Sequence, residues 1–315
     1  MWKYLTNDKY NEFLLSLNLV NTSDIKKVNK ILYNITNNID NNYEEKIILK
    51  KSGKKRFLTE PSSILKNIQR RILKNVLEER RLSSAITSYR KGYSLIDNAK
   101  MHINKKYILK LDIKNFFDNI TFKKVYDVCF NEDFYPKKMG FLLANLCCYD
   151  NKLPQGAPTS GYISNLVLRN FDIKINNYCL INNISYSRYA DDLTFSGDFD
   201  INYLINLVRT LLKEEGFILN AKKTKILNNS RRQLVTGIVV NKKLNISKKY
   251  KKKIRQDIYY IKKYGLDSHL IYTNNTNNEL YIKKLLGKIC FVLSVEKKNK
   301  EFINYKNYIL NNFVS

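Results

Sequence analysis

Apolar positions in the first part of the chain follow helical and strand spacing in turn. After residues 22–24 (Thr-Ser-Asp), which can cap a helix, apolar residues over 25–35 fall on one helical face. Residues 46–50 and 56–59 flank a Ser-Gly pair and predict a hairpin with a basic tip. Residues 61–63 (Pro-Ser-Ser) then predict the start of a second amphipathic helix.

The centre of the chain mixes strands with helices, and its end is helical throughout. Strands are predicted over 107–111, 184–188, 193–196, 217–219 and 234–240. Helices are predicted over 121–130, 137–148, 201–215, 247–264, 279–295 and 300–313. This order predicts an α+β fold with a mixed N-terminal part, a central sheet and a helical C-terminal lobe.

The composition is that of a globular protein, but its charge is strongly one-sided. The 315 residues are 44% hydrophobic and 27% charged, which allows one large core or two to three subdomains. The 56 Lys and Arg residues outnumber 28 Asp and Glu residues, so the formal net charge is +28. An AT-rich genome would raise Lys and Asn without halving the acids relative to the bases. The excess therefore indicates a polyanionic partner, and nucleic acid is the leading candidate.

The five cysteines contain no CxxC pair and no His–Cys spacing typical of a metal site. Cys147 and Cys148 lie in an apolar run and are expected as buried free thiols, which fits a reducing compartment. No apolar run approaches the roughly 20 residues that span a bilayer, and the N-terminus lacks the apolar segment of a signal peptide. We therefore expect a cytoplasmic protein with no membrane partner.

Two adjacent carboxylates, Asp191 and Asp192, stand between two predicted strands, where a tight turn would hold both at an exposed tip. Such a pair also has an ordinary explanation, because Asp tolerates turn geometry and hydrogen-bonds its own backbone. A third carboxylate, Asp112, ends the strand over 107–111 and is expected beside that turn. Together the three acids match the hard oxygen ligands that Mg²⁺ needs when two ions serve nucleotidyl transfer.

Four motifs around these acids resemble those of reverse transcriptases. Leu111-Asp-Ile-Lys-Asn-Phe-Phe117 resembles motif A, and Tyr189-Ala-Asp-Asp192 resembles motif C. Residues 153–160 (Leu-Pro-Gln-Gly-Ala-Pro-Thr-Ser) resemble motif B, and residues 216–224 resemble motif D. The resemblance extends from about residue 50 to residue 240. It implies a right-hand polymerase with fingers, an antiparallel-sheet palm and a helical thumb.

The resemblance also implies roles for single residues. Asp112, Asp191 and Asp192 would be the catalytic metal ligands for two Mg²⁺ ions, with Mn²⁺ as a possible substitute. Phe117 would exclude a ribose 2′-hydroxyl, whereas the neighbouring Phe116 is expected in the core.

Other residues would bind or protonate parts of the nucleotide. Gln155 would lie against the incoming nucleotide or the templating base. Lys223 would protonate the leaving pyrophosphate, although a solvated lysine is an open alternative. Lys55 and Arg56, beside the basic hairpin tip, would grip the triphosphate, and the register within 50–56 stays open.

Two short elements resemble those of retron reverse transcriptases. Residues 98–102 (Asn-Ala-Lys-Met-His) match Asn-Ala-x-x-His, and residues 235–237 match Val-Thr-Gly. The first element implies Asn98 and His102 as RNA contacts, and His102 is not expected to be catalytic. Gly161 departs from the retron form, in which Pro more often follows the motif B serine.

The helix predicted over 247–264 carries eight cations and a single acid, Asp257. A charge this one-sided predicts a thumb helix that follows a nucleic-acid duplex. Lys252 and Arg255 are therefore further candidate RNA contacts.

The implied domains are an N-terminal helical and fingers part over 1–104, a palm over 105–240 and a helical thumb over 241–315. Within the palm, residues 121–158 would belong partly to the fingers. The implied enzyme is an RNA-directed DNA polymerase of the retron type. It would use dNTPs to copy part of a cognate structured noncoding RNA into single-stranded DNA, primed by a guanosine 2′-hydroxyl and branched to the RNA. The resemblance further implies antiphage defence with a separate effector protein, and a host RNase H for template removal.

Two other interpretations stay open from the sequence. A group II intron-like or diversity-generating reverse transcriptase would carry the same four motifs. A non-catalytic RNA-binding scaffold with a polymerase fold would carry the same charge, but it would not need three carboxylates together with Gln155 and Lys223.

Overall fold

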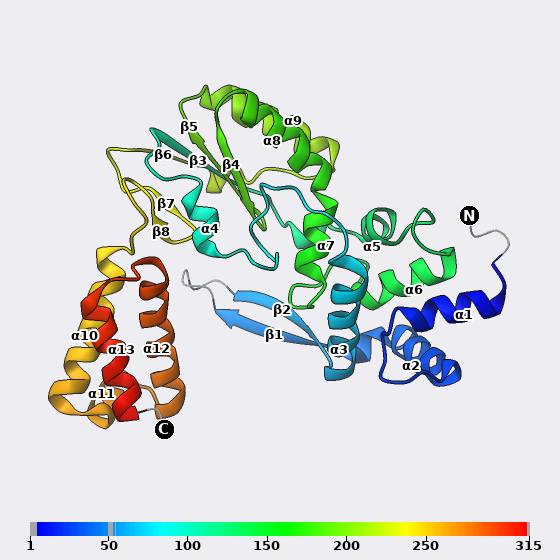
Figure 1. Cartoon of the computed structure of the whole chain (residues 1–315), viewed down its shortest axis with the longest axis horizontal. Helices are drawn as coiled ribbons and strands as arrows, with labels where there is room; N and C mark the ends of the chain where they lie inside the picture. The colour runs from blue at the N-terminus through cyan, green and yellow to red at the C-terminus, as the bar shows by residue number, and fades with distance from the viewer. Residues whose placement is uncertain (1–4, 50–52, 54, 314–315) are drawn as a thin grey trace. The chain divides into compact units, whose positions relative to one another are not determined.

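The computed structural model describes residues 5–49, 53 and 55–313, and the chain divides into two compact units (Figure 1). The first unit consists of Met1–Tyr93, Leu109–Phe195 and Phe199–Lys225, and the second of Ser94–Ile108, Ser196–Asp198 and Ile226–Ser315. Helices and antiparallel strand pairs occur together in the chain, so the α+β class is confirmed. The division into 1–104, 105–240 and 241–315 stays a prediction.

Two helices, α1 (Asn7–Ser16) and α2 (Ile25–Asn37), open the first unit, and each buries part of one apolar face. The start of α2 is capped as predicted, because Oδ1 of Asp24 accepts the N–H of Lys26 at 2.9 Å. The predicted amphipathic pattern is therefore confirmed for this helix.

The predicted hairpin is also present. Strands β1 (Tyr43–Leu49) and β2 (Lys55–Pro61) pair antiparallel, and α3 (Ser63–Ile72) follows with Ser62 as its N-cap. The predicted basic tip falls partly on residues 50–52 and 54, which lie outside the described part of the chain.

A four-stranded sheet carries the predicted acids. Its strands lie in the order β4-β5-β3-β6 and comprise β3 (Tyr107–Asp112), β4 (Ser185–Tyr189), β5 (Asp192–Gly197) and β6 (Lys225–Asn228). The other α-helices of the first unit are α5 (Phe122–Val125), α6 (Lys137–Cys147), α7 (Ser160–Val167), α8 (Arg169–Ile181) and α9 (Ile201–Glu214). Short 3-10 or π turns are η1 (Ile39–Asn42), η2 (Leu73–Leu77), η3 (Phe117–Asn119), η4 (Tyr126–Phe130) and η5 (Ala221–Lys223).

The second unit contains a helical bundle and a small hairpin. Its helices are α4 (Leu95–Lys100), α10 (Lys248–Tyr264), α11 (Leu266–Tyr272), α12 (Asn278–Val295) and α13 (Lys300–Phe313), and its hairpin joins β7 (Leu234–Val235) to β8 (Ile238–Val239) (Figure 1). Ile254, Ile258 and Ile261 of α10 are buried in the core of this unit. The basic helix thus has one apolar face, as its sequence predicts.

Two predicted strands are wrong. Residues 217–219 form only an isolated pairing between Leu219 and Ile113, and no regular strand. Residues 234–240 form a hairpin, because Thr236 and Gly237 have φ angles of 47° and 86° that reverse the chain. Helices α1, α4, α8 and α11 and strand β6 were not predicted.

Burial of the cysteines agrees with the sequence. Cys147 and Cys148 are buried free thiols, and burial raises the pKa of Cys129 to about 12. Within the ranges that the structure describes, no helix is both long enough and apolar enough to cross a membrane.

Candidate active site

Main-chain hydrogen bonds bring three of the motifs together at one end of the central sheet. Asp112 ends β3, and the next residue, Ile113, donates its N–H to the carbonyl oxygen of Asp191 at 3.0 Å. On its other side, the carbonyl oxygen of Asp112 accepts the N–H of Asn220, in motif D, at 2.7 Å. The neighbouring Asp192 begins β5, which lies beside β3 in the sheet. The predicted carboxylates therefore come from adjacent strand ends.

A lysine and an amide hold the side chain of Asp112. Lys223 Nζ donates to Oδ2 at 2.7 Å, and Asn220 Nδ2 donates to Oδ1 at 3.2 Å. Partial burial lowers the pKa of Lys223, but its hydrogen bond to Asp112 and the nearby carboxylates outweigh this effect and raise it. Lys223 is therefore a charged partner of Asp112 and not an isolated solvated lysine.

The turn carboxylates differ in their surroundings. Burial, and then the negative charges of Asp112 and Asp192, raise the pKa of Asp191. Asp192 is more open and lies 3.7 Å from Lys110 Nζ. A divalent cation would relieve the repulsion between Asp191 and the two neighbouring carboxylates.

The described residues contain no ready-made cluster of three or more acidic, His or Cys ligands for a metal. Asp112 is instead paired with Lys223. Mg²⁺ usually takes one or two carboxylates and completes its shell with water and substrate phosphates. Asp112 and Asp191 fit that mode of binding, because their charges interact and their carboxylate oxygens are hard ligands.

The turn that presents Asp191 contains a strained residue. Ala190 has a φ angle of 57°, in the left-handed region that costs a residue with a Cβ about 1 kcal/mol. Two side chains hold it there: Ser88 Oγ accepts the N–H of Ala190 at 2.8 Å, and Arg188 Nη1 donates to its carbonyl oxygen at 3.1 Å. The N–H and the carbonyl group of the strained Ala190 are thus both fixed next to the carboxylate of Asp191.

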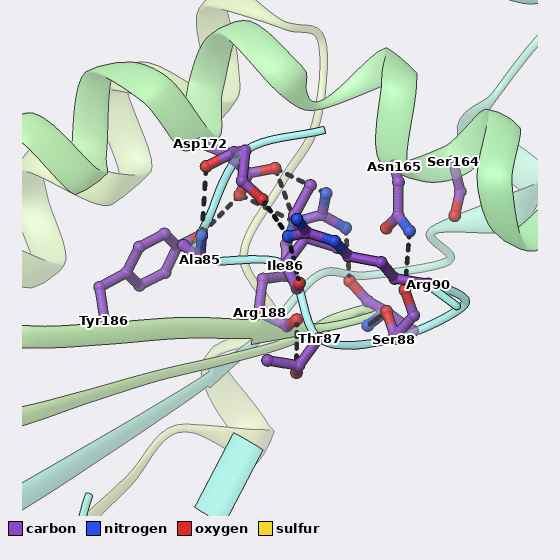
Figure 2. A network of polar contacts seen from close by, with 12 residues as sticks. Ala85, Ile86, Thr87, Ser88, Arg90, Ser164, Asn165, Asp172, Tyr186 and Arg188 are labelled. Carbon is purple, nitrogen blue, oxygen red and sulfur yellow. Dashed lines mark hydrogen bonds and ion pairs between the residues drawn. The ribbon is translucent and has the colours of Figure 1, made fainter. Parts of the chain in front are cut away.

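Arg188 is itself fixed by a completely buried ion pair (Figure 2). Its Nη2 and Nε donate to Oδ2 and Oδ1 of Asp172 at 2.6 and 2.9 Å, and the hydroxyl of Tyr186 donates to the same carboxylate at 2.7 Å. Neither charged side chain is exposed, so each depends on the other for compensation. Asp172 comes from α8, whereas Tyr186 and Arg188 come from β4.

The segment that supplies Ser88 is anchored to the same strand. The main chain of Arg188 donates to the carbonyl oxygen of Ala85 at 2.9 Å and accepts from the N–H of Thr87 at 3.2 Å. Asn165 of α7 donates to the carbonyl oxygen of Ser88 at 2.9 Å (Figure 2). Sequence reasoning missed Ser88, Asn165 and Asp172, because each supports the turn from a distant part of the chain.

Phe117 lies at the end of a row of aromatic rings. It is half-buried, with its ring centroid 5.4 Å from that of the buried Phe116, which in turn lies 5.6 Å from Phe217. Lys124 Nζ covers the Phe217 ring at 4.0 Å and donates to the carbonyl oxygen of Glu215 at 2.7 Å. The prediction that Phe116 belongs to the core is confirmed, and Phe117 is left partly accessible.

The motif B turn packs against the hairpin. The carbonyl oxygen of Gln155 accepts the N–H of Thr59 in β2 at 2.9 Å. Gly156 follows with φ of 142°, and a Cβ built there would lie 2.7 Å from the carbonyl oxygen of Thr59. Glycine is therefore required by the close approach of the two main chains.

Gly161 has a steric explanation. A Cβ at this position would lie 2.3 Å from the ring of Tyr89. The departure from the usual retron motif B therefore accommodates an aromatic ring against the first turn of α7.

The two predicted triphosphate-binding residues lie in β2. Lys55 is exposed and pairs in register with Leu49. Arg56 pairs with Ile48, but its side chain lies outside the described part of the structure.

Asn98 and His102 do not face solvent, in contrast to the expectation of direct RNA contacts. Both side chains are fully buried in the second unit, where His102 Nδ1 shares a 2.7 Å hydrogen bond with Ser196 Oγ. Nearby, Thr236 of the Val-Thr-Gly element donates to the carbonyl oxygen of Leu95 at 3.1 Å. The physical reason is packing: the two short elements hold α4 against the β7–β8 hairpin, so a supporting role for Asn98 and His102 is favoured.

The two α10 candidates differ. Lys252 is exposed, as an RNA contact would require. Arg255 forms a two-pronged ion pair with Glu301 of α13, at 2.6 and 2.7 Å. Arg255 is therefore neutralised within the bundle, and it would have to leave Glu301 to bind a phosphate.

Comparison with known proteins bears on these motifs. Residues 48–281 match the reverse transcriptase (RNA-dependent DNA polymerase) family. The chain is 32% identical over 272 residues to the Retron Ec86 reverse transcriptase of Escherichia coli, covering 84% of this chain and 81% of that protein. It is also 32% identical over 257 residues to the Retron Ec83 reverse transcriptase of Escherichia coli, covering 76% of this chain and 79% of the other.

Similar solved structures are more distant. Telomerase from Candida albicans gives a TM-score of 0.46 at 13% identity, covering 85% of this chain and 59% of that one. The foamy viral protease–reverse transcriptase gives 0.41 at 14% identity, covering 98% and 60%. The family assignment depends on the sequence matches alone.

Those matches include most of this chain and most of the length of both retron proteins. They also agree with the spatial convergence of motifs A, C and D, and they confirm the predicted right-hand polymerase class. Reverse transcriptases as a family use divalent metal ions and act on RNA templates. The chain therefore belongs to the retron reverse transcriptases, and it is an RNA-directed DNA polymerase.

Proposed function

We propose that this polymerase works by two-metal nucleotidyl transfer, with Asp112, Asp191 and Asp192 as ligands of two Mg²⁺ ions, for which Mn²⁺ can substitute. The observation that carries this proposal is the 3.0 Å hydrogen bond from Ile113 to the carbonyl oxygen of Asp191, because it joins the two carboxylate-bearing strand ends. When bound, the ions would activate the attacking hydroxyl and neutralise the triphosphate. The protein's own contribution is to hold the three carboxylates in place before substrate arrives.

The other predicted residues would act on the nucleotide. Lys223, already charged and bonded to Asp112, would turn to the leaving pyrophosphate and give it a proton. Phe117 would exclude a 2′-hydroxyl on the incoming dNTP, and Gln155 would line the nucleotide site next to β2. Lys55 and Arg56 would neutralise the triphosphate from the hairpin.

The natural template and product follow from the retron assignment. We propose a cognate structured noncoding RNA as template, priming from a guanosine 2′-hydroxyl, and a single-stranded DNA branched to that RNA. A host RNase H would remove copied template, and a separate effector protein would connect the product to antiphage defence. In this proposal residues 1–104 supply the fingers, 105–240 the palm and 241–315 the thumb. A cytoplasmic location stays a prediction.

Co-expression of the protein with the noncoding DNA beside its gene tests this function. The expected product is single-stranded DNA carrying a branched RNA that RNase removes. Asp191→Asn and Asp192→Asn should abolish it, whereas Asp127→Asn, an exposed acid of the η4 turn, should not. Undiminished product in the first two variants would contradict the metal-ligand assignment.

A further inference from the structure

A cavity in the helical bundle has the chemistry of a site for an aromatic ring. It has a volume of about 380 Å³, within the range of roughly 300–1,000 Å³ typical of small-ligand sites. Its lining residues come from the end of α10 and from α11, namely Tyr260, Tyr264, Ser268, His269 and Tyr272. Four of the five are aromatic rings, and none carries a carboxylate.

The rings are arranged in a near-parallel row. Tyr260 lies at centroid distances of 6.0 Å from Tyr264 and 6.3 Å from His269, with interplanar angles of 23° and 16°. His269 is buried, and its Nε2 is fixed by a 2.8 Å hydrogen bond with the hydroxyl of Tyr281. The inner end of the row is therefore held rigidly by the bundle.

The outer part of the cavity is open to solvent. Tyr264 is 54% exposed and Tyr272 is 83% exposed, so much of both rings is accessible to a ligand. The chain reverses at Gly265, where a φ angle of 80° ends α10 and begins α11. This reversal is what places tyrosines from two helices around one cavity.

One cation lies beside the lining rings, because Lys263 Nζ is 5.1 Å from the ring of Tyr264. Lys262 lies instead 4.6 Å from the ring of Tyr308 in α13, and the exposed Asp267 precedes the lining residue Ser268. A planar, uncharged ring joined to an anionic backbone fits the lining and Lys263, because the ring stacks on the tyrosines and a phosphate meets the lysine. A cationic ligand is disfavoured, since none of the lining residues carries a negative charge.

We propose that this cavity binds an unpaired nucleobase of the RNA that the enzyme recognises. Loops and bulges in folded RNA are read mainly through such unstacked bases, which settle on aromatic side chains. The Ser268 and tyrosine hydroxyls supply hydrogen bonds to the base edge. The proposal rests on the assignment as an RNA-directed polymerase, and it adds a recognition site separate from the catalytic carboxylates.

Binding of two labelled RNA hairpins to the full-length protein tests the proposal by fluorescence anisotropy. The hairpins are identical except that one carries a single bulged adenosine and the other is fully paired. We expect the wild type to bind the bulged hairpin about tenfold more tightly, the contribution of about one stacked base. Tyr264→Leu and Tyr272→Leu should remove this preference, whereas Tyr264→Phe should keep it.

The matched control is Tyr259→Leu. Tyr259 is 55% exposed on the same helix but does not line the cavity, so its replacement should leave the preference intact. Asp191→Asn should also retain the preference while losing DNA synthesis, which separates this site from the catalytic proposal. Equal binding of both hairpins by the wild type, or a preference that survives Tyr264→Leu, would overturn the proposal and leave the cavity to a protein partner.

Discussion

Replacing Asp172 with Asn would leave the guanidinium of Arg188 buried without its counter-ion. Both side chains are completely buried, and Arg188 donates to the Asp172 carboxylate at 2.6, 2.9 and 3.1 Å. Removing one partner of such a pair costs about 3–5 kcal/mol, because the remaining charge has no solvent to compensate it. We therefore expect Asp172→Asn to lower the free energy of unfolding by that amount.

The double variant Asp172→Leu/Arg188→Met separates stability from positioning. With neither charge present, part of the lost stability should return, since a buried pair is often no more stable than apolar residues of similar volume. The remainder reflects the buried hydroxyl of Tyr186, which loses its acceptor on Asp172. The 3.1 Å hydrogen bond from Arg188 to the carbonyl oxygen of Ala190 is still lost. A bond from a charged group contributes about 1.5–3 kcal/mol, so kcat should stay about 10- to 100-fold below wild type.

Urea unfolding and steady-state primer extension on an RNA template measure the two effects. Lys174→Met is the matched control, because Lys174 lies on the same helix as Asp172 and forms an exposed 2.8 Å ion pair with Glu214 of α9. That exposed pair should contribute less than about 1 kcal/mol. A double variant as unstable as Asp172→Asn would refute the charge-compensation reasoning, and one with wild-type kcat would refute the positioning role of Arg188.

Burial raises the pKa of Asp257 despite the nearby Lys288. Ionisation of Asp257 therefore costs more free energy in the folded state than in the unfolded chain, and this cost destabilises the fold at neutral pH. Asp257→Asn should therefore raise Tm at pH 7–8, and calorimetry should show this gain fading as the pH falls toward about 4, the ordinary Asp value. Phe117→Ala should weaken discrimination against ribonucleotides by roughly tenfold or more in single-nucleotide extension, and unchanged rejection would count against the steric gate. Gly156→Ala should cost about 1–3 kcal/mol in urea unfolding, because its Cβ would meet the main chain of β2, and a neutral result would mean that the turn can move. Lys223→Ala should lower kcat about 100-fold, and it should tighten the apparent affinity for Mg²⁺ because it frees the Asp112 carboxylate. Tighter Mg²⁺ binding without any loss of kcat would exclude the proton-donor role.

Features that depend on residues close together in the sequence could be predicted. The cap at Asp24, the end of β3 at Asp112 and the basic face of α10 each depend on neighbouring residues alone. The carboxylate turn was found in the same way, because an acidic pair between two strand-like runs is a local signal. Local chemistry thus predicted where the candidate site begins and which acids it presents.

The supports of that site could not be predicted, because they depend on pairs that are far apart in the chain. Ser88 looks like an ordinary polar loop residue, and only the structure brings its hydroxyl to the N–H of Ala190. Asp172 looks like an exposed acid in an amphipathic helix until Arg188 is found against it. The strand predicted over 234–240 failed for a related reason, since Thr236 adopts a positive φ that β-branched residues rarely take.

The conformation of the Ala190–Asp191 turn is energetically unfavourable, whereas the hydrogen bonds that support it are favourable. Ala190 is strained, and burial together with like charge opposes ionisation of Asp191. Against these costs stand two hydrogen bonds to Ala190 and one from Ile113 to the carbonyl oxygen of Asp191. A turn held from both sides cannot relax to relieve the carboxylates. In the proposed metal site, a divalent cation at Asp191 would relieve the repulsion that folding retains there. The buried Arg188 pair would then affect metal affinity as well as stability.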